Sequence, residues 1–145
     1  MNVEYEMLDL IDLISERHLL LRNYVENMWN ENSDINISNS EWFIMARIYK
    51  KELTISYVTK NVDITRQAVH KFIKRLESKG LVLVSDSNEN RRNKCIRLTD
   101  LGEQCYEKNQ DLKAKLEKEI KDSIGEEKFE LLKDILQSSW GKVEL

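Results

Sequence analysis

The sequence predicts a mainly α-helical fold that carries one small β-hairpin (α+β), and three observations predict it. The 145-residue chain has no proline and only four glycines, so its helices meet few residues that would interrupt them. Apolar residues recur every three or four positions near both ends of the chain, which is the spacing of amphipathic helices. Between these regions, two short apolar segments flank a polar stretch, which is typical of a hairpin.

The N-terminal residues 1–30 predict one long amphipathic helix. Its apolar stripe consists of Val3, Met7, Leu10, Ile14, Leu21, Val25 and Met28. At 1.5 Å per residue, a helix from Val3 to Trp29 would run roughly 40 Å, and a small domain cannot cover a stripe of that length. We therefore expect it to pack on a partner copy as an N-terminal dimerisation helix. The polar residues 30–39 predict a loop.

Residues 40–100 predict a compact lobe that begins with three helices. Ser40 can cap the first helix, Thr54 the second and Thr65 the third, because a hydroxyl side chain accepts hydrogen bonds from the free N–H groups of a first turn. Gly80 follows the third helix at the position where helices commonly end. The second and third helices are short and joined by a tight turn, which predicts a helix-turn-helix.

A β-hairpin is expected directly after this unit. Leu81–Val84 and Cys95–Leu98 predict its two strands, and residues 85–94 form the polar tip. The hairpin would lie beside the helix-turn-helix as a wing, so the predicted lobe is a winged helix-turn-helix.

Residues 101–145 are expected to be helical again. Thr99 or Asp100 can cap a long helix, Gly125 breaks it, and a last helix follows. The apolar stripes of the two helices contain Leu101, Tyr106, Leu112, Leu116, Ile120 and Ile124, and then Phe129, Leu131, Leu132, Ile135, Leu136 and Trp140. We expect these C-terminal dimerisation helices and residues 1–30 to form one intertwined domain around the lobe.

The charge is distributed unevenly along the chain. The whole chain carries a net −3, but residues 65–97 hold nine basic and three acidic residues, a net +6, which leaves −9 for the remainder. A basic module in an acidic body is typical of a protein that binds a polyanion, and double-stranded DNA is the expected partner. The alternative is an ordinary solvated charged face.

The third helix of the lobe carries side chains suited to DNA contact. Arg66, Gln67, His70 and Lys71 lie in its first two turns, where they can contact base edges. Lys74 and Arg75 lie further along and would meet phosphates, and Thr65 can serve as a cap or as a phosphate contact. At the hairpin tip, Arg91, Arg92 and Lys94 can approach a minor groove. The alternatives are a solvated helix face and a basic loop with no partner.

Other classes of protein are disfavoured. The two histidines lie on different predicted helices, and no catalytic, metal-binding or phosphate-loop motif occurs, so we expect no enzyme, no metal and no cofactor. No segment is apolar enough to span a membrane, and the N-terminus is acidic, so we expect a cytoplasmic protein. The two cysteines, Cys95 and Cys105, are expected to be free thiols.

The region from Thr54 to Gly102 resembles the MarR family of transcription regulators. Residues 65–82 are similar to the recognition helix of the family and the start of its first wing strand, and residues 98–102, Leu-Thr-Asp-Leu-Gly, match the family's Leu-Thr-x-x-Gly. The Asp-x-Arg signature of the wing corresponds to residues 90–92, Asn-Arg-Arg, so Asn90 stands where an acid is usual and Arg92 would be the wing-tip arginine. A register with Glu89 and Arg91 needs a one-residue insertion.

The resemblance implies a homodimer on a pseudo-palindromic operator, usually acting as a repressor. Many members release DNA on binding small phenolic or lipophilic ligands. The peroxide-sensing mechanism of one branch does not carry over, because no cysteine precedes Cys95. The candidate residues for an effector pocket are His18, Leu21, Val25, Trp29 and Trp42, with a plain core, or an interface role for His18, as the alternative. The rival function is a winged-helix adaptor that binds protein partners without specific DNA binding.

Overall fold

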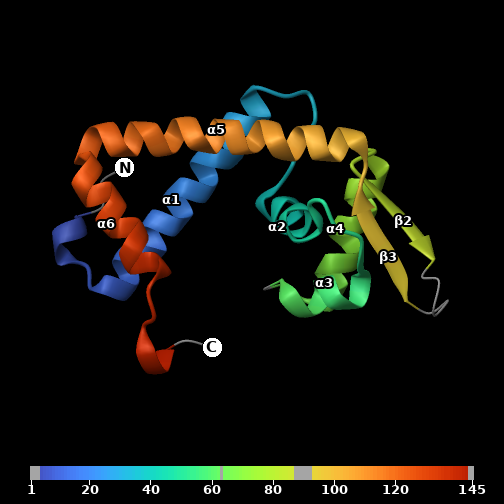
Figure 1. Ribbon diagram of the computed structural model, residues 1–145, viewed down its shortest axis with the longest axis horizontal. Helices are drawn as coiled ribbons and strands as arrows, with labels where there is room; N and C mark the ends of the chain where they lie inside the picture. Colours follow the sequence, from blue (N-terminus) through green and yellow to red (C-terminus); the bar gives the residue numbers. More distant parts are fainter. Residues whose placement is uncertain (1–3, 63, 87–92, 144–145) are drawn as a thin grey trace. The chain divides into compact units, whose positions relative to one another are not determined.

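The computed structural model describes residues 4–62, 64–86 and 93–143 (Figure 1). Most of these residues lie in helices, and one small antiparallel sheet accompanies them, so the predicted fold class is confirmed. The chain divides into two compact units, Met1–Asn109 and Gln110–Leu145. The first unit holds the predicted lobe.

Helix α1 (Leu10–Glu31) follows a short 3₁₀ turn, Tyr5–Met7, and begins later than the apolar pattern predicted. The Asp9 side chain accepts a hydrogen bond from the Asp12 N–H and fixes the start of the helix. Only Val25 and Trp29, near its C-terminal end, are buried. In the part of the chain that the structure describes, Leu10, Ile11 and Ile14 in the N-terminal half of the helix are exposed.

Helix α2 (Asn39–Ile48) starts one residue after Ser38, and the predicted cap at Ser40 is wrong. Ser38 and Glu41 form a capping box: the Ser38 hydroxyl accepts from the Glu41 N–H, and the Glu41 carboxylate accepts from the Ser38 N–H. The residue three positions after Ser40 is Phe43, which cannot return such a bond. The reciprocal pair therefore sets the start of the helix.

The helix-turn-helix consists of α3 (Ile55–Asn61) and α4 (Arg66–Ser78). Both predicted caps are confirmed, because Thr54 accepts from the Tyr57 N–H and Thr65 accepts from the Ala68 N–H. The inner faces of these helices are apolar and buried: Val58 on α3, and Val69, Ile73 and Leu76 on α4. Gly80 has φ +75° and follows α4, as predicted for the end of the helix.

The sheet has three antiparallel strands in the order β1-β3-β2. The hairpin strands are β2 (Val82–Asp86) and β3 (Lys94–Leu98), with Val84 opposite Ile96. Strand β1 (Leu53–Thr54) pairs with the other edge of β3 and was not predicted from the sequence. Two residues are too few to show the alternation that predicts a strand.

The base of the hairpin is fixed where β3 turns into α5 (Asp100–Ile124). The Thr99 hydroxyl donates to the Gly80 carbonyl at 2.6 Å and accepts from the Gly102 N–H at 3.0 Å, while the Thr99 N–H donates to the Leu81 carbonyl at 3.0 Å. A Cβ on Gly102 would overlap that same Leu81 carbonyl oxygen. The end of α4, both hairpin strands and the start of α5 therefore meet at one point.

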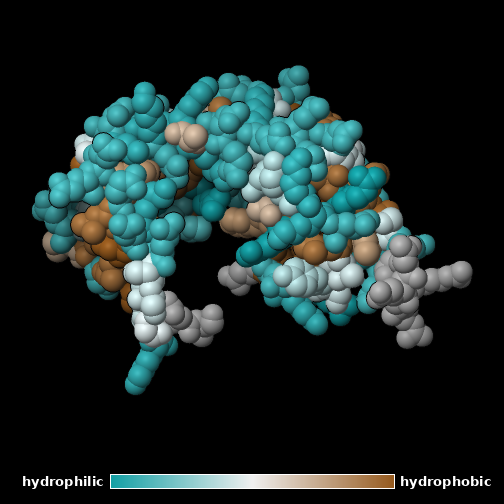
Figure 2. All heavy atoms as spheres, in the orientation of Figure 1, coloured by the Kyte–Doolittle hydropathy of each residue, from teal (hydrophilic) through white to brown (hydrophobic). Residues whose placement is uncertain are grey.

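The second unit contains the rest of α5 and helix α6 (Glu126–Gln137), followed by a 3₁₀ turn, Gly141–Val143. Gly125 adopts φ +94° between the helices, which confirms the predicted break. Apolar residues reach the surface along α6, where Figure 2 shows hydrophobic side chains. They are Leu131, Leu132, Ile135 and Leu136, and all four are exposed.

Candidate nucleic-acid interface

Helix α4 presents one continuous polar face to solvent. The residues predicted to contact DNA from this helix and its cap are all exposed, and they are Thr65, Arg66, Gln67, His70, Lys71, Lys74 and Arg75. The opposite face of the same helix is buried through Val69, Ile73 and Leu76. The structure therefore places the candidates together on one side of α4, and the core holds that side outward.

A groove of about 670 Å³ runs beside this face. It is lined by residues of α3, α4 and the hairpin, namely Ile55, Ser56, Thr59, Lys60, Arg66, His70, Ile73, Lys74, Glu77, Val84, Asn93 and Lys94. Four of these side chains are cationic (Lys60, Arg66, Lys74 and Lys94) and one is anionic, Glu77. The groove is thus a basic channel between the recognition helix candidate and the hairpin.

Three polar lining residues on α3 were not predicted from the sequence: Ser56, Thr59 and Lys60. The signal for two of them was present, because Ser56 and Lys60 are four residues apart and fall on one face of a helix. Val58, the buried residue of α3, shows which face packs inward. Lys60 precedes residues 65–97, the range over which the net charge of +6 was counted, so that count did not include it.

The basic residues of the α4 face are available for a partner. Among the residues that the structure describes, Arg66, Lys71 and Lys74 make no ion pair within 4.0 Å, whereas Lys50, Lys79 and Lys121 are paired with carboxylates. Arg75 lies 5.5 Å from the centre of the Phe72 ring. An unpaired cation on a polar surface loses no existing partner when it meets a phosphate.

The structure describes only part of the hairpin tip. Arg91 and Arg92, like Asn90, lie outside the described residues, so their expected role stays a prediction from the sequence. Lys94 opens strand β3, is exposed and lines the groove opposite α4. The hairpin therefore brings at least one predicted basic residue to the candidate interface.

The five candidates for an effector pocket do not share one environment. Val25, Trp29 and Trp42 are buried, whereas His18 and Leu21 are exposed on α1. The rings of Trp29 and Trp42 pack edge to face at 5.0 Å, and the Trp29 indole N–H donates to the Ile35 carbonyl at 2.8 Å. The buried Trp42 indole N–H has no hydrogen-bond partner among the described residues.

A second hollow of about 570 Å³ lies beside Trp29, between the end of α1, residues 31–35 and α5. Leu101, Gln104, Cys105 and Lys108 line it from α5. Both cysteines are free thiols, and burial raises the pKa of the Cys105 thiol, an effect that nearby Lys108 opposes.

The described part of the chain holds no group of three or more His, Cys, Asp or Glu side chains placed to bind a metal ion. None of its described helices is both long and apolar enough to cross a membrane.

Comparison with known proteins points to one family. Residues 37–94 match the sequence profile of the MarR family. Over 101 residues the chain is 34% identical to the uncharacterized HTH-type transcriptional regulator YdgJ of Bacillus subtilis (strain 168), and the match covers 69% of this chain. The chain spans 62% of the length of that relative.

Solved structures share the fold at low identity. The reduced form of MarR from E. coli superimposes with a TM-score of 0.81 at 18% identity, over 90% of this chain and 96% of that one. A MarR mutant from E. coli complexed with operator DNA superimposes with a TM-score of 0.75 at 17% identity, over 94% of this chain and 97% of that one. A MepR mutant from S. aureus superimposes with a TM-score of 0.73 at 20% identity, over 89% of this chain and 94% of that one.

Proposed function

We propose that the chain is a transcription regulator of the MarR family and that it acts as a homodimeric repressor, which binds a pseudo-palindromic operator through helix α4. The observation that carries the proposal is the polar face of α4, from Arg66 to Arg75, turned outward beside a basic groove. A helix of this kind fits the major groove of B-DNA. The complex of a MarR mutant with operator DNA is a property of that protein and supports the proposal by analogy.

The α4 face divides into two parts with different tasks. Arg66, Gln67 and His70 lie in the first turns, where the recognition helix of a helix-turn-helix protein meets base edges. Lys74 lies two turns further along, beside Lys60 and Lys94 in the groove, and would neutralise phosphates. The first group would determine which sequence is bound, and the second would supply affinity for any duplex.

Exposed apolar residues on two helices support the dimer. The N-terminal half of α1 leaves Leu10, Ile11 and Ile14 in solvent. On α6, Leu131, Leu132, Ile135 and Leu136 occupy positions i, i+1, i+4 and i+5, which fall on one side of a helix. Stripes of this kind are buried at interfaces between copies in symmetric dimers. A dimer would present two α4 helices about 34 Å apart, one turn of DNA.

Release by a small lipophilic or aromatic effector is part of the proposal. The hollow beside Trp29 offers the indole ring and Leu101 as apolar contacts. Such a ligand would act by changing the distance between the two α4 helices rather than by covering them. A regulator of this type works in the cytoplasm, where the chromosome lies.

A salt titration separates this function from the rival one, an adaptor that binds only protein. The probe is a duplex that the unchanged protein selects from a random-sequence pool, and affinity is followed by fluorescence anisotropy. We expect the logarithm of the binding constant to fall linearly with the logarithm of the salt concentration. Lys74→Ala should reduce the slope by about two, one phosphate contact for each copy in the dimer.

The matched control is Lys118→Ala, because Lys118 is an exposed lysine on α5 that does not line the groove, and its slope should be that of the unchanged protein. An adaptor would select no sequence and would show weak binding without a steep slope. That result would reject the proposed function.

A second prediction concerns base recognition. Gln67→Ala should relax the preference for one base pair in each half-site by roughly 1–3 kcal/mol, because a glutamine side chain pairs bidentately with adenine. The measurement is the affinity for a panel of duplexes that carry single base-pair changes. If all members of the panel weaken equally, Gln67 contacts the backbone and the assignment of its role is wrong.

A further inference from the structure

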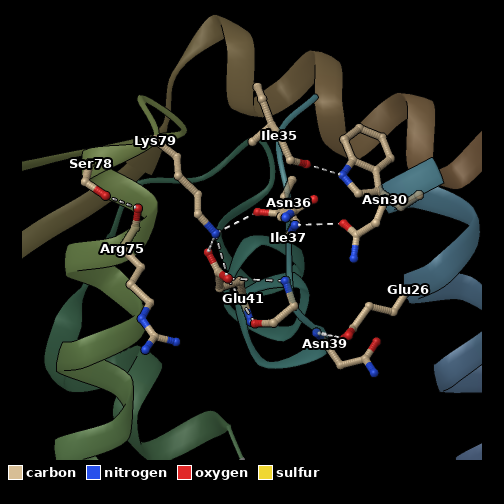
Figure 3. A network of polar contacts seen from close by, with 12 residues as sticks. Glu26, Asn30, Ile35, Asn36, Ile37, Asn39, Glu41, Arg75, Ser78 and Lys79 are labelled. Atoms are coloured by element: carbon tan, nitrogen blue, oxygen red, sulfur yellow. Dashed lines mark hydrogen bonds and ion pairs between the residues drawn. The ribbon is translucent and has the colours of Figure 1, made fainter. Parts of the chain in front are cut away.

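One lysine of the basic module, Lys79, donates hydrogen bonds to acceptors within the protein. Lys79 is the C-terminal cap residue of α4, and its ammonium group donates to three oxygens (Figure 3). They are Glu41 Oε2 at 2.7 Å, Glu41 Oε1 at 2.9 Å and the Asn36 carbonyl at 2.7 Å. An ammonium group has three hydrogens, so its donor capacity is used here and not on a phosphate.

The carboxylate that receives Lys79 is buried. The Glu41 side chain is 3% exposed, against 28% for the Lys79 side chain. Glu41 Oε1 also accepts from the Ser38 N–H at 3.2 Å and from the Ser38 hydroxyl at 3.0 Å. A buried carboxylate with this many donors holds its partners in a fixed geometry, because each lost bond would leave a buried charge less satisfied.

The segment that Glu41 and Lys79 hold is attached in turn to α1. The Asn30 side chain accepts from the Ile37 N–H at 3.2 Å, and Glu26 accepts from the Asn39 N–H at 2.8 Å. The Trp29 indole donates to the Ile35 carbonyl at 2.8 Å. Figure 3 shows the sequence of contacts, from Glu26 and Asn30 on α1, through residues 35–39, to Lys79 at the end of α4.

This attachment lies at the end of α4 opposite to the residues proposed to contact bases. Helix α4 has 13 residues and is roughly 20 Å long. A tilt of about 5° at its C-terminal end therefore moves the first turn by roughly 1.7 Å, given 1.5 Å of rise per residue. A shift of that size takes a side chain out of hydrogen-bond distance from a base edge.

We propose that Glu41 and Lys79 are positioning residues for DNA recognition: their partly buried ion pair fixes the end of α4 to residues 35–39 and, through Asn30 and Glu26, to α1. The inference rests on the proposed function and adds to it, because it assigns the orientation of the recognition helix to contacts made 13 residues away from Arg66. It also gives Lys79, one of the nine basic residues counted in residues 65–97, a role within the protein. A movement of α1 would therefore shift α4 through these hydrogen bonds and the ion pair.

The test uses the double variant Glu41→Gln/Lys79→Met in the full chain. It removes both charges and keeps side chains of similar length, so no unpaired charge is left in the core. The probes are a duplex selected by the unchanged protein and a scrambled duplex of the same composition. We expect a folded variant whose ratio of selected to scrambled affinity falls at least tenfold, with an unchanged salt slope on the scrambled duplex.

Two further variants separate positioning from other roles. Lys79→Arg keeps a cation that can bind the Glu41 carboxylate, and its affinity ratio should stay within about threefold of the unchanged protein. Lys50→Met breaks the exposed pair between Lys50 and Glu103, whose Nζ–Oε2 distance is 3.1 Å, and should leave the ratio unchanged.

Each other outcome has a definite meaning. A double variant that melts at a lower temperature but keeps the affinity ratio within twofold overturns the positioning role and leaves the proposed function standing. Parallel loss on both duplexes, with a slope reduced by about two, would make Lys79 a phosphate contact and also overturn it. If the unchanged protein selects no duplex, the proposed function and this inference both fall.

Discussion

Replacing Gly102 by alanine is expected to destabilise the protein, although alanine is the better helix former. Gly102 lies in the first turn of α5, where helix propensity alone would make alanine more stable by up to about 1 kcal/mol. The added Cβ would overlap the Leu81 carbonyl oxygen, which belongs to the backbone and already accepts from the Thr99 N–H. Overpacking of this kind costs about 1–3 kcal/mol, and the rigid neighbour puts this case at the upper end.

The measurement is thermal unfolding followed by circular dichroism. A loss of this size should lower Tm by about 5–10 °C in a chain of this length. Gln104→Ala is the matched control, because Gln104 is exposed two residues further along the same helix and should change Tm little. A Gly102→Ala protein that melts at the same temperature as the unchanged chain, or higher, would show that the close approach to Leu81 does not exist.

The second large effect is expected from Ile135→Glu on α6. Ile135 lies in the exposed apolar stripe of that helix, and a carboxylate there would have to be buried without a partner in the proposed dimer interface. We expect a species of about 17.2 kDa, the mass of one chain, in place of one twice as heavy, in analytical ultracentrifugation. Affinity for the selected duplex should fall by on the order of 100-fold or more, because two separate copies would then bind the two half-sites independently.

Gln137→Glu provides the control for this variant. It adds the same charge to the same helix, but position 137 lies on the side of α6 opposite to the stripe. We expect Gln137→Glu to stay dimeric and to bind DNA like the unchanged protein. Should Ile135→Glu also remain dimeric and bind normally, the α6 stripe is not the interface.

The features that the sequence predicted well are those whose signals are local. Thr54 and Thr65 could be identified as caps because each side chain bonds to a backbone N–H three residues away. Gly80 and Gly125 could be identified as helix ends because the left-handed backbone favours glycine. The exposed polar side of α4 could be identified from the spacing of its apolar residues, because the buried apolar side fixes the polar side as well.

The features that the sequence missed depend on residues far apart in the chain. Strand β1 exists because β3 offers a free edge to Leu53, 43 residues before its partner Ile96. Lys79 counts as a basic surface residue in the sequence and becomes a partner of Glu41 only when α2 lies against the end of α4. Lys60 joins the basic groove because α3 packs beside α4. No local pattern in the sequence predicts these contacts.

Hydroxyl-radical footprinting on the selected duplex tests most directly whether two copies of α4 act together on DNA. Two protected clusters should appear, related by two-fold symmetry and centred about 10 base pairs apart, because successive major grooves on one side of B-DNA are about 34 Å apart. A single cluster, or uniform protection without a fixed position, would contradict the account that two α4 helices are held at the spacing of one helical turn.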